Sequence, residues 1–173
     1  MPTTTNHFDL VALALGYVDK WLAGFAADIA FFDKLSTAFG QNIDLNTAET
    51  IREEWHSGTW NRPPIEVVTA DDIAGANAAY AAETGTVYIS AQFLERAAAN
   101  ATSVGAVLLE EIGHHVDTLL NVTDSIGDEG AIFAELVRAG TLDEQHLQAL
   151  KAEDDTAIVQ IEGDTVQIEM AQS

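Results

Sequence analysis

Apolar residues recur with the spacing of helices before residue 40 and again after residue 103, but with that of strands between them, and this change constrains the fold most. Between residues 8 and 39 the apolar positions fall three and four residues apart, which is the spacing of one face of an α-helix. Residues 86–90 read Thr-Val-Tyr-Ile-Ser, a β-branched and aromatic run typical of a strand. Helical spacing returns after residue 103. The sequence therefore predicts an α+β protein in which helices pack on a small mixed β-sheet.

The expected elements form three parts of one domain. A length of 173 residues suits a single domain with one core. We expect N-terminal helices within residues 1–60, a central part over 65–140, and a helix followed by a β-hairpin over 141–173. Residues 1–7 read as a frayed tail, and residues 76–82 give no clear signal. Individual helices are expected at residues 8–39, 47–56, 91–99, 104–120, 129–139 and 142–153, strands at 65–69 and 86–90, and the hairpin at 157–169.

Helix ends are expected where capping residues and glycines stand. Gly40 and Gly140 follow helical runs, and glycine is the commonest residue just past a helix end. Short polar side chains before a helical run accept hydrogen bonds from its first N–H groups. The expected N-caps are Asn46 or Thr47, Ser90, Ser103, Asp128 or Gly127, and Thr141.

The chain is strongly acidic, with 28 acidic and 7 basic residues and a net charge of −21. Phosphates are repelled by such a surface, so nucleic acid is excluded as a partner and an anionic membrane surface is disfavoured. Divalent cations are instead concentrated near the protein. The chain contains no cysteine, which excludes disulfides and thiolate metal sites.

Neither a signal peptide nor a membrane span is predicted. Residues 1–7 carry no basic group of the kind that begins a secretory signal. No apolar run reaches the roughly 18 residues that a spanning helix needs. We expect a protein that is cytoplasmic or exported by a route without a cleavable signal.

Four ionisable side chains gather in the helix expected at residues 104–120. Residues four apart share a face of a helix, which pairs Glu110 with His114 and Glu111 with His115. An imidazole and a carboxylate at this spacing can hold one divalent ion. A further carboxylate beside the ion can act as a general base on water. The segment therefore predicts a metal centre, with Glu110 and His114 as ligands and Glu111 beside them.

A third ligand is expected from the next helix. Glu129 stands near its start, and Gly130 would let another helix approach closely. The connection over residues 121–126 is short enough to fold this helix back onto the preceding one. Simpler interpretations stay open: a solvated helix face for residues 110–115, a favourable place for Glu129 near a helix N-terminus, and a capping role for Asp128.

The segment resembles the zincin metallopeptidases, and most closely their small gluzincin members. Those proteins carry His-Glu-x-x-His on a helix and a glutamate ligand on a following helix. The resemblance covers roughly residues 65–140 and implies a metal-dependent hydrolase that acts on peptides or proteins. It implies Glu111 as the general base, His114 as the second histidine ligand and Glu129 as the distant glutamate ligand.

The resemblance extends upstream of this helix. Residues 79–90 resemble the edge strand that binds extended substrate by pairing with its backbone. This implies Val87, Tyr88 and Ile89 as the strand that holds substrate.

The sequence departs from the family motif at one position. Glu110 stands where the family has its first histidine, so the implied site has two carboxylates and one imidazole. Zinc is the expected ion, and manganese or calcium are alternatives because carboxylates favour harder ions. His115 is an alternative ligand if the helix is rotated, and Asp117 and Asp128 are candidates for orienting the ligands.

Two hypotheses of different classes follow. The first is a metal-dependent hydrolase, a peptidase or a degenerate relative of one. The second is a non-catalytic metal-binding or structural module of a larger exported bacterial protein that matures in calcium. The sequence predicts neither the substrate nor the oligomeric state.

Overall fold

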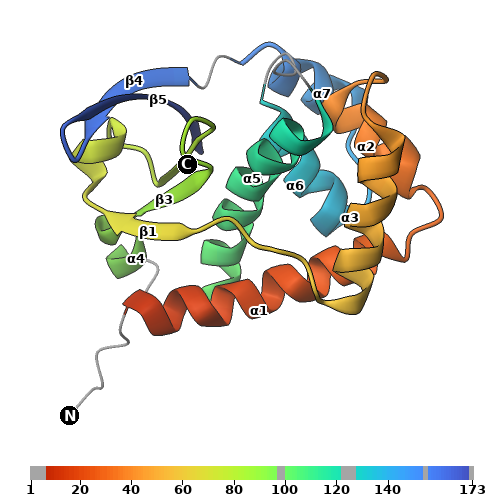
Figure 1. The fold of residues 1–173 in the computed structure, drawn as a ribbon, viewed down its shortest axis with the longest axis horizontal. Coiled ribbons are helices and arrows are strands. Elements are labelled where there is room, and N and C mark those ends of the chain that lie inside the picture. The colour runs from red at the N-terminus through yellow and green to blue at the C-terminus, as the bar shows by residue number, and fades with distance from the viewer. Residues whose placement is uncertain (1–6, 97–99, 122–127, 154–155, 172–173) are drawn as a thin grey trace.

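A computed structural model describes residues 7–96, 100–121, 128–153 and 156–171 of the chain (Figure 1). Residues 1–6 of the tail expected at 1–7, the end of the helix expected at 91–99 and most of the connection before Asp128 lie outside the described residues, whereas His7 begins a helix instead of ending a tail. The helices are α1 (His7–Ala26), α2 (Phe31–Phe39), α3 (Leu45–Ser57), η1 (a short 3₁₀ helix, Ala70–Ile73), α4 (Ala91–Arg96), α5 (Ala101–Leu120), α6 (Glu129–Ala139) and α7 (Glu144–Lys151). The strands are β1 (Ile65–Val68), β2 (Ala78–Ala81), β3 (Thr86–Ser90), β4 (Thr156–Ile161) and β5 (Asp164–Ala171).

The strands form one mixed sheet in the order β1-β3-β2-β5-β4. β1 pairs with β3 in parallel, and the other neighbours are antiparallel. β4 and β5 are the predicted hairpin, which turns at Glu162 and Gly163 with φ of 53° and 87°. Two consecutive positive φ angles match the twist of a two-residue hairpin turn. The predicted α+β class is confirmed, as are the C-terminal hairpin and the strands at β1 and β3.

The expected position of β3 at a sheet edge is wrong. β3 lies between β1 and β2 and pairs with both, so its backbone cannot also pair with an extended peptide. Its residues Val87, Tyr88 and Ile89 are buried. The reason is β2, which forms from an alanine-rich segment with little intrinsic preference for strands. All four residues of β2 are buried between β3 and β5, so tertiary pairing decides this element.

The single helix expected over residues 8–39 is in fact two helices, α1 and α2. The break follows Ala26, where the Asp28 carboxylate accepts a hydrogen bond from the Ala30 amide and pairs with Lys34. A side chain that satisfies nearby N–H groups in this way competes with continuation of the helix. The two helices are bent by 114° to each other, and they meet the length and apolarity of a membrane span only as this bent pair. Within the described ranges, no helix alone is long and apolar enough to cross a membrane.

Asparagine and aspartate provide most of the helix starts. Asn100 caps α5 through the Ser103 amide, Asp44 caps α3, and Asp143 caps α7, so the expected caps at Ser103, Asn46 or Thr47, and Thr141 are wrong by two or three residues. The expected caps at Ser90 and Asp128 are confirmed, because their side chains accept from the Phe93 and Ala131 amides. α6 has its predicted bounds, and Gly140 follows it with φ of 80°.

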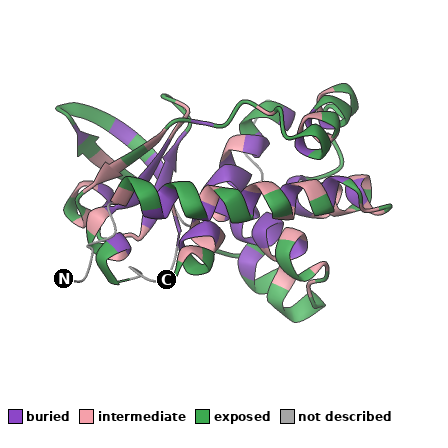
Figure 2. Ribbon diagram, turned by 90° about the horizontal axis from the view of Figure 1, so that it is seen from below, coloured by how far each residue is buried: buried purple, intermediate pink, exposed green. Residues whose placement is uncertain are grey.

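The main core lies where α5 packs between α1, α6 and one face of the sheet (Figures 1 and 2). Figure 2, seen from the side of α1, shows exposed residues on the outer surface of that helix and buried residues behind it. Alternate strand residues face opposite sides of the sheet. Tyr80, Val87 and Ile89 therefore belong to the main core, while Tyr88 and Ile168 belong to a second cluster on the other face.

Candidate metal centre

The centre is built on the buried face of α5. Glu111, His114 and Asp117 stand three residues apart, so they follow one side of the helix, and each is at most 1% exposed. Apolar neighbours such as Leu108 and Ile112 are equally buried. These three polar residues thus face the interior instead of solvent, and the solvated-face interpretation fails for Glu111 and His114.

Two glycines let α5 and α6 approach each other closely. A Cβ atom on Gly113 would lie 2.8 Å from Gly130 Cα, and one on Gly130 would lie 2.7 Å from His114 Nε2. Contacts this short do not occur between real Cβ atoms and their neighbours. The predicted role of Gly130 is confirmed, and the close approach brings the start of α6 beside His114.

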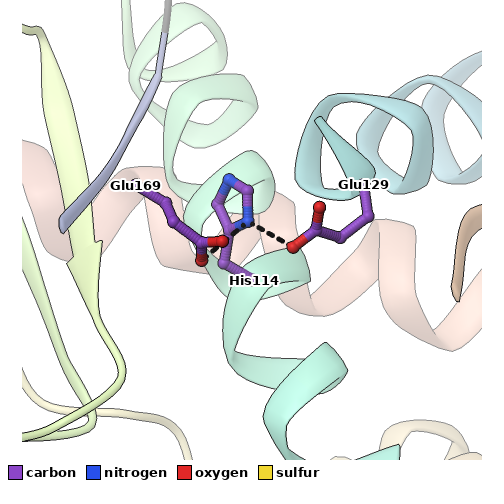
Figure 3. A group of neighbouring side chains, drawn as sticks. All are labelled: His114, Glu129 and Glu169. Atoms are coloured by element: carbon purple, nitrogen blue, oxygen red, sulfur yellow. Dashed lines mark hydrogen bonds and ion pairs between the residues drawn. The ribbon is translucent and has the colours of Figure 1, made fainter. Parts of the chain in front are cut away.

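The His114 imidazole is surrounded by carboxylates. Its Nδ1 lies 3.0 Å from Glu129 Oε1 and 3.2 Å from Glu169 Oε2, while its Nε2 lies 3.7 Å from Asp128 Oδ1. Figure 3 shows the side chains of His114, Glu129 and Glu169 converging from α5, α6 and β5. The His114 and Glu129 side chains are 1% and 0% exposed, and that of Glu169 is 12% exposed.

These three residues can hold a divalent ion. Each offers one ligand atom, and the three atoms lie within 4.8 Å of one another. Ligand atoms that share an ion about 2.1 Å away lie at most roughly 4 Å apart, so small side-chain rotations would bring these three atoms to the spacing that one ion needs. Glu129 Oε2 is fully buried and has no hydrogen-bond partner among the described residues. A buried oxygen without a partner is costly, and a cation would satisfy it.

Burial controls the ionisation of the acids here. It raises the pKa of Glu129 to about 7, against the hydrogen bond from His114, which lowers it. Burial also raises the pKa of Glu110 to about 7, and the nearby Asp128 charge adds to that rise. Because both pKa values lie near neutral pH, a bound cation would readily shift Glu110 and Glu129 to the ionised form. Without a cation, a large share of both carboxyl groups is protonated at that pH.

Glu110 and His115 lie outside the group of three ligand residues. Glu110 is half-buried, and its backbone carbonyl faces Gly130 of α6. His115 points toward the sheet, where its Nδ1 lies 2.8 Å from the Tyr80 hydroxyl, and burial lowers its pKa. The rotation of α5 thus directs His114 toward α6 and β5, and directs His115 toward β2.

The two aspartates predicted to orient ligands have different surroundings. Asp117 accepts a hydrogen bond of 2.7 Å from Asn121, which also donates to the Phe39 carbonyl, so Asp117 organises the end of α5. Asp128 caps α6 and also faces His114 Nε2. Both proposed roles of Asp128 are thus compatible with its position.

Glu169 is the residue that sequence reasoning missed. It stands in β5, 40 positions after Glu129, and its cross-strand partner in β2 is Tyr80. Strand alternation turns Glu169 toward α5, away from Ile168 and the second cluster. The available signal was that Glu169 is a charged residue near the apolar end of a predicted strand. This signal does not say which residues lie near Glu169, because that depends on the pairing of β2 with β5.

A small pocket opens beside this centre. It has a volume of about 100 Å³ and is lined by Tyr80, Ala82, Glu83, Gln167 and Glu169. Glu169 therefore belongs both to the ligand group and to the pocket wall. Comparison with known proteins adds nothing to this site, since no family model, curated protein or solved structure matches the chain.

Proposed function

We propose that this protein is a metal-dependent hydrolase that acts on peptide bonds, with its ion held by His114, Glu129 and Glu169. The observation that supports it most directly is the convergence of one ligand atom each from α5, α6 and β5 to within 4.8 Å of one another. Glu129 Oε2 is buried in this group and has no hydrogen-bond partner among the described residues. The alignment with the zincin motif supports the substrate class. Glu169 takes the place in the ligand set that the sequence suggested for Glu110.

The donor set favours a divalent cation. One imidazole and two carboxylates suit zinc and manganese, and two negative charges balance such an ion. The net charge of −21 adds a field that concentrates cations near the protein. A divalent ion held there supplies Lewis acidity toward a peptide carbonyl and toward water.

Glu111 is the group proposed to move the proton. It lies three residues before His114, one helical turn away on the same side of α5, and is fully buried. Its carboxylate takes a proton from the attacking water as the new C–O bond forms. It then returns the proton to the leaving amine as the C–N bond breaks.

Metal content tests the site. We expect one zinc or manganese per chain by elemental analysis, and loss of that ion in His114→Ala. The matched control is His146→Ala, which changes an exposed histidine on α7 and should keep the ion. Absence of any stoichiometric ion in the wild-type protein would leave only a buried imidazole–carboxylate cluster.

Hydrolysis tests the role of Glu111. Glu111→Gln should keep the ion and slow cleavage of an unstructured protein such as casein by about 10²–10⁴-fold, the usual contribution of a general base. The control is Glu49→Gln, an exposed acid on α3 that should leave the rate unchanged. Equal rates in wild type and Glu111→Gln would remove Glu111 from the chemistry.

A second candidate is a non-catalytic metal-binding module. It is favoured by the way the ligand group joins two helices to the C-terminal hairpin, as a structural ion would, and by the interior position of β3. This candidate predicts a bound ion, a large stabilisation by that ion and no cleavage of casein.

A further inference from the structure

A line of exposed residues follows the outer face of α1, and its members are the α1 stripe: Asp9, Leu13, Gly16 and Lys20. They follow one another at steps of four, three and four residues, so they lie along one side of the helix. All four are exposed, and Leu13 is 60% exposed. Figure 2 shows exposed residues along this outer surface, and α1 forms the lower edge of the molecule in Figure 1.

The α1 stripe is electrically neutral, although the chain has a net charge of −21. Its charged residues are Asp9 at one end and Lys20 at the other, roughly 16 Å apart along the helix axis. In the part of the chain that the structure describes, neither of them forms an ion pair. Two acidic chains repel each other over most of their surfaces. A neutral stripe that carries one charge of each sign lets a second copy approach without that repulsion.

The middle of the α1 stripe combines a large side chain with a glycine. The position that a Cβ atom would take on Gly16 has no other part of the described chain within 4 Å, apart from its own helix backbone. The space above Gly16 is therefore open to a side chain from outside. Leu13 stands one helical turn earlier and is exposed beside this space. Where two helices pack, a side chain of one fills a hole on the other.

We propose that α1 is the contact of a two-fold symmetric dimer, in which the α1 helices of two copies of this chain pack antiparallel. With the symmetry axis between residues 14 and 15, Asp9 lies opposite Lys20 of the second copy. In the same register, Leu13 lies opposite Gly16 of the second copy. Each match occurs twice because a two-fold contact uses the same surface on both chains. One register thus pairs opposite charges at both ends and places leucine over glycine at both central positions.

The size of this contact sets the expected affinity. It spans about three turns of each helix, with Tyr17, which is 42% exposed, on one flank of the stripe. Stable complexes bury about 1,200–2,000 Å², and contacts below this range are weak. We therefore expect a dissociation constant on the order of 100 µM.

Sedimentation equilibrium of the full chain tests the dimer at concentrations from about 10 µM to about 1 mM. The average mass should rise from that of one chain toward that of two. Leu13→Ala should raise the dissociation constant at least about tenfold, because both leucine contacts are lost. The matched control is Leu45→Ala, which truncates a leucine on α3 that is 64% exposed and should dimerise as the wild type does.

Charge exchange tests the antiparallel register. Asp9→Lys and Lys20→Asp each place like charges opposite each other at both ends of the contact. Each should weaken the dimer about ten- to hundredfold. The double variant Asp9→Lys/Lys20→Asp restores opposite charges and should recover the dissociation constant of the wild type. A double variant that stays as weak as the single variants would overturn the proposed register.

Gly16→Gln tests the central contact in a variant that keeps its fold. The space over Gly16 is open in the single chain, and glutamine favours a helix more than glycine does. Thermal unfolding should therefore show no loss of stability, while the dimer should weaken at least about tenfold because the new side chain occupies the place of Leu13. The control is Gly24→Gln, at an equally open position four residues beyond the end of the stripe, and it should dimerise as the wild type does.

This dimer does not depend on the metal centre, so its failure would leave that centre untouched. A chain that has the mass of a monomer at every concentration overturns the dimer and leaves the α1 stripe to a different occupant. A dimer that Leu13→Ala and Gly16→Gln leave as strong as that of the wild type overturns α1 as the contact.

Discussion

His114 is the residue on which the centre depends, because carboxylates face both of its nitrogens. An imidazole in this position either is protonated and balances the acids or gives one nitrogen to an ion. Glu129 Oε2 has no hydrogen-bond partner in the part of the chain that the structure describes, and this favours the second arrangement, since a protonated imidazole would leave that oxygen unsatisfied. Carboxylate ligands should then control affinity for the ion.

Glu169→Gln tests this at the residue scale. The amide keeps the size of the side chain but removes the charge, so the variant should bind zinc at least about 10–100-fold more weakly. Loss of a residue that only hydrogen-bonds a metal ligand already weakens metal binding by that factor. Competition with a fluorescent chelator measures the change. Glu95→Gln changes an exposed acid on α4 and should bind as the wild type does. Equal affinities for the two variants would exclude Glu169 as a ligand.

At the scale of elements, the contact between α5 and α6 sets the geometry of the site. Gly113 and Gly130 remove the side chains that would hold these helices apart. Asp128 and Glu129 stand at the first turn of α6, so the distance between the two helix axes determines their distance from His114.

Gly130→Ala tests that contact. Its new methyl group would overlap the Glu110 carbonyl and the His114 ring, so we expect a loss of about 1–3 kcal/mol in the free energy of unfolding and weaker metal binding. Gly24→Ala in α1 is the control, because nothing lies within 4 Å of its Cβ position. Alanine there should stabilise the protein by up to about 1 kcal/mol. Chemical denaturation measures both, and similar effects in the two variants would contradict a tight helix contact.

At the scale of the whole molecule, the ion would join parts that are distant in sequence. α5, α6 and the C-terminal hairpin meet at one point, where buried acids add to a strongly negative chain. Stability should therefore depend on both pH and metal, and in opposite directions.

The metal-free protein should lose stability as pH rises from about 4.5 to about 7. The folded-state pKa of Glu129 is raised to about 7 from an ordinary value of 4.5, so the folded state holds the proton that the unfolded state has lost. Above pH 7 this effect should level off. Thermal unfolding in EDTA measures it, and Glu129→Gln should flatten the dependence. A metal-free stability that rises across this pH range would contradict the buried position of Glu129.

The ion should reverse that trend. Binding requires ionised carboxylates, so added zinc should raise the melting temperature more at pH 8 than at pH 5. At a free ion concentration one hundred times the dissociation constant, the stabilisation is about 2.7 kcal/mol. His114→Ala should show no metal-dependent shift at either pH. A shift that is equal in the variant and in the wild type would place the ion elsewhere.

Local chemistry was sufficient to predict the α+β class, α6 with its bounds, the C-terminal hairpin, and the meeting of His114 with Glu129. These features depend on spacing, turn residues and a short connection, all of which act over a few positions of the chain. Tertiary structure alone decided that β2 forms, that β3 is an interior strand and that α1 ends at Ala26. It also decided that Glu169, and not Glu110, stands in one group with His114 and Glu129, because the rotation of a helix and the pairing of distant strands depend on packing energies that no local pattern contains.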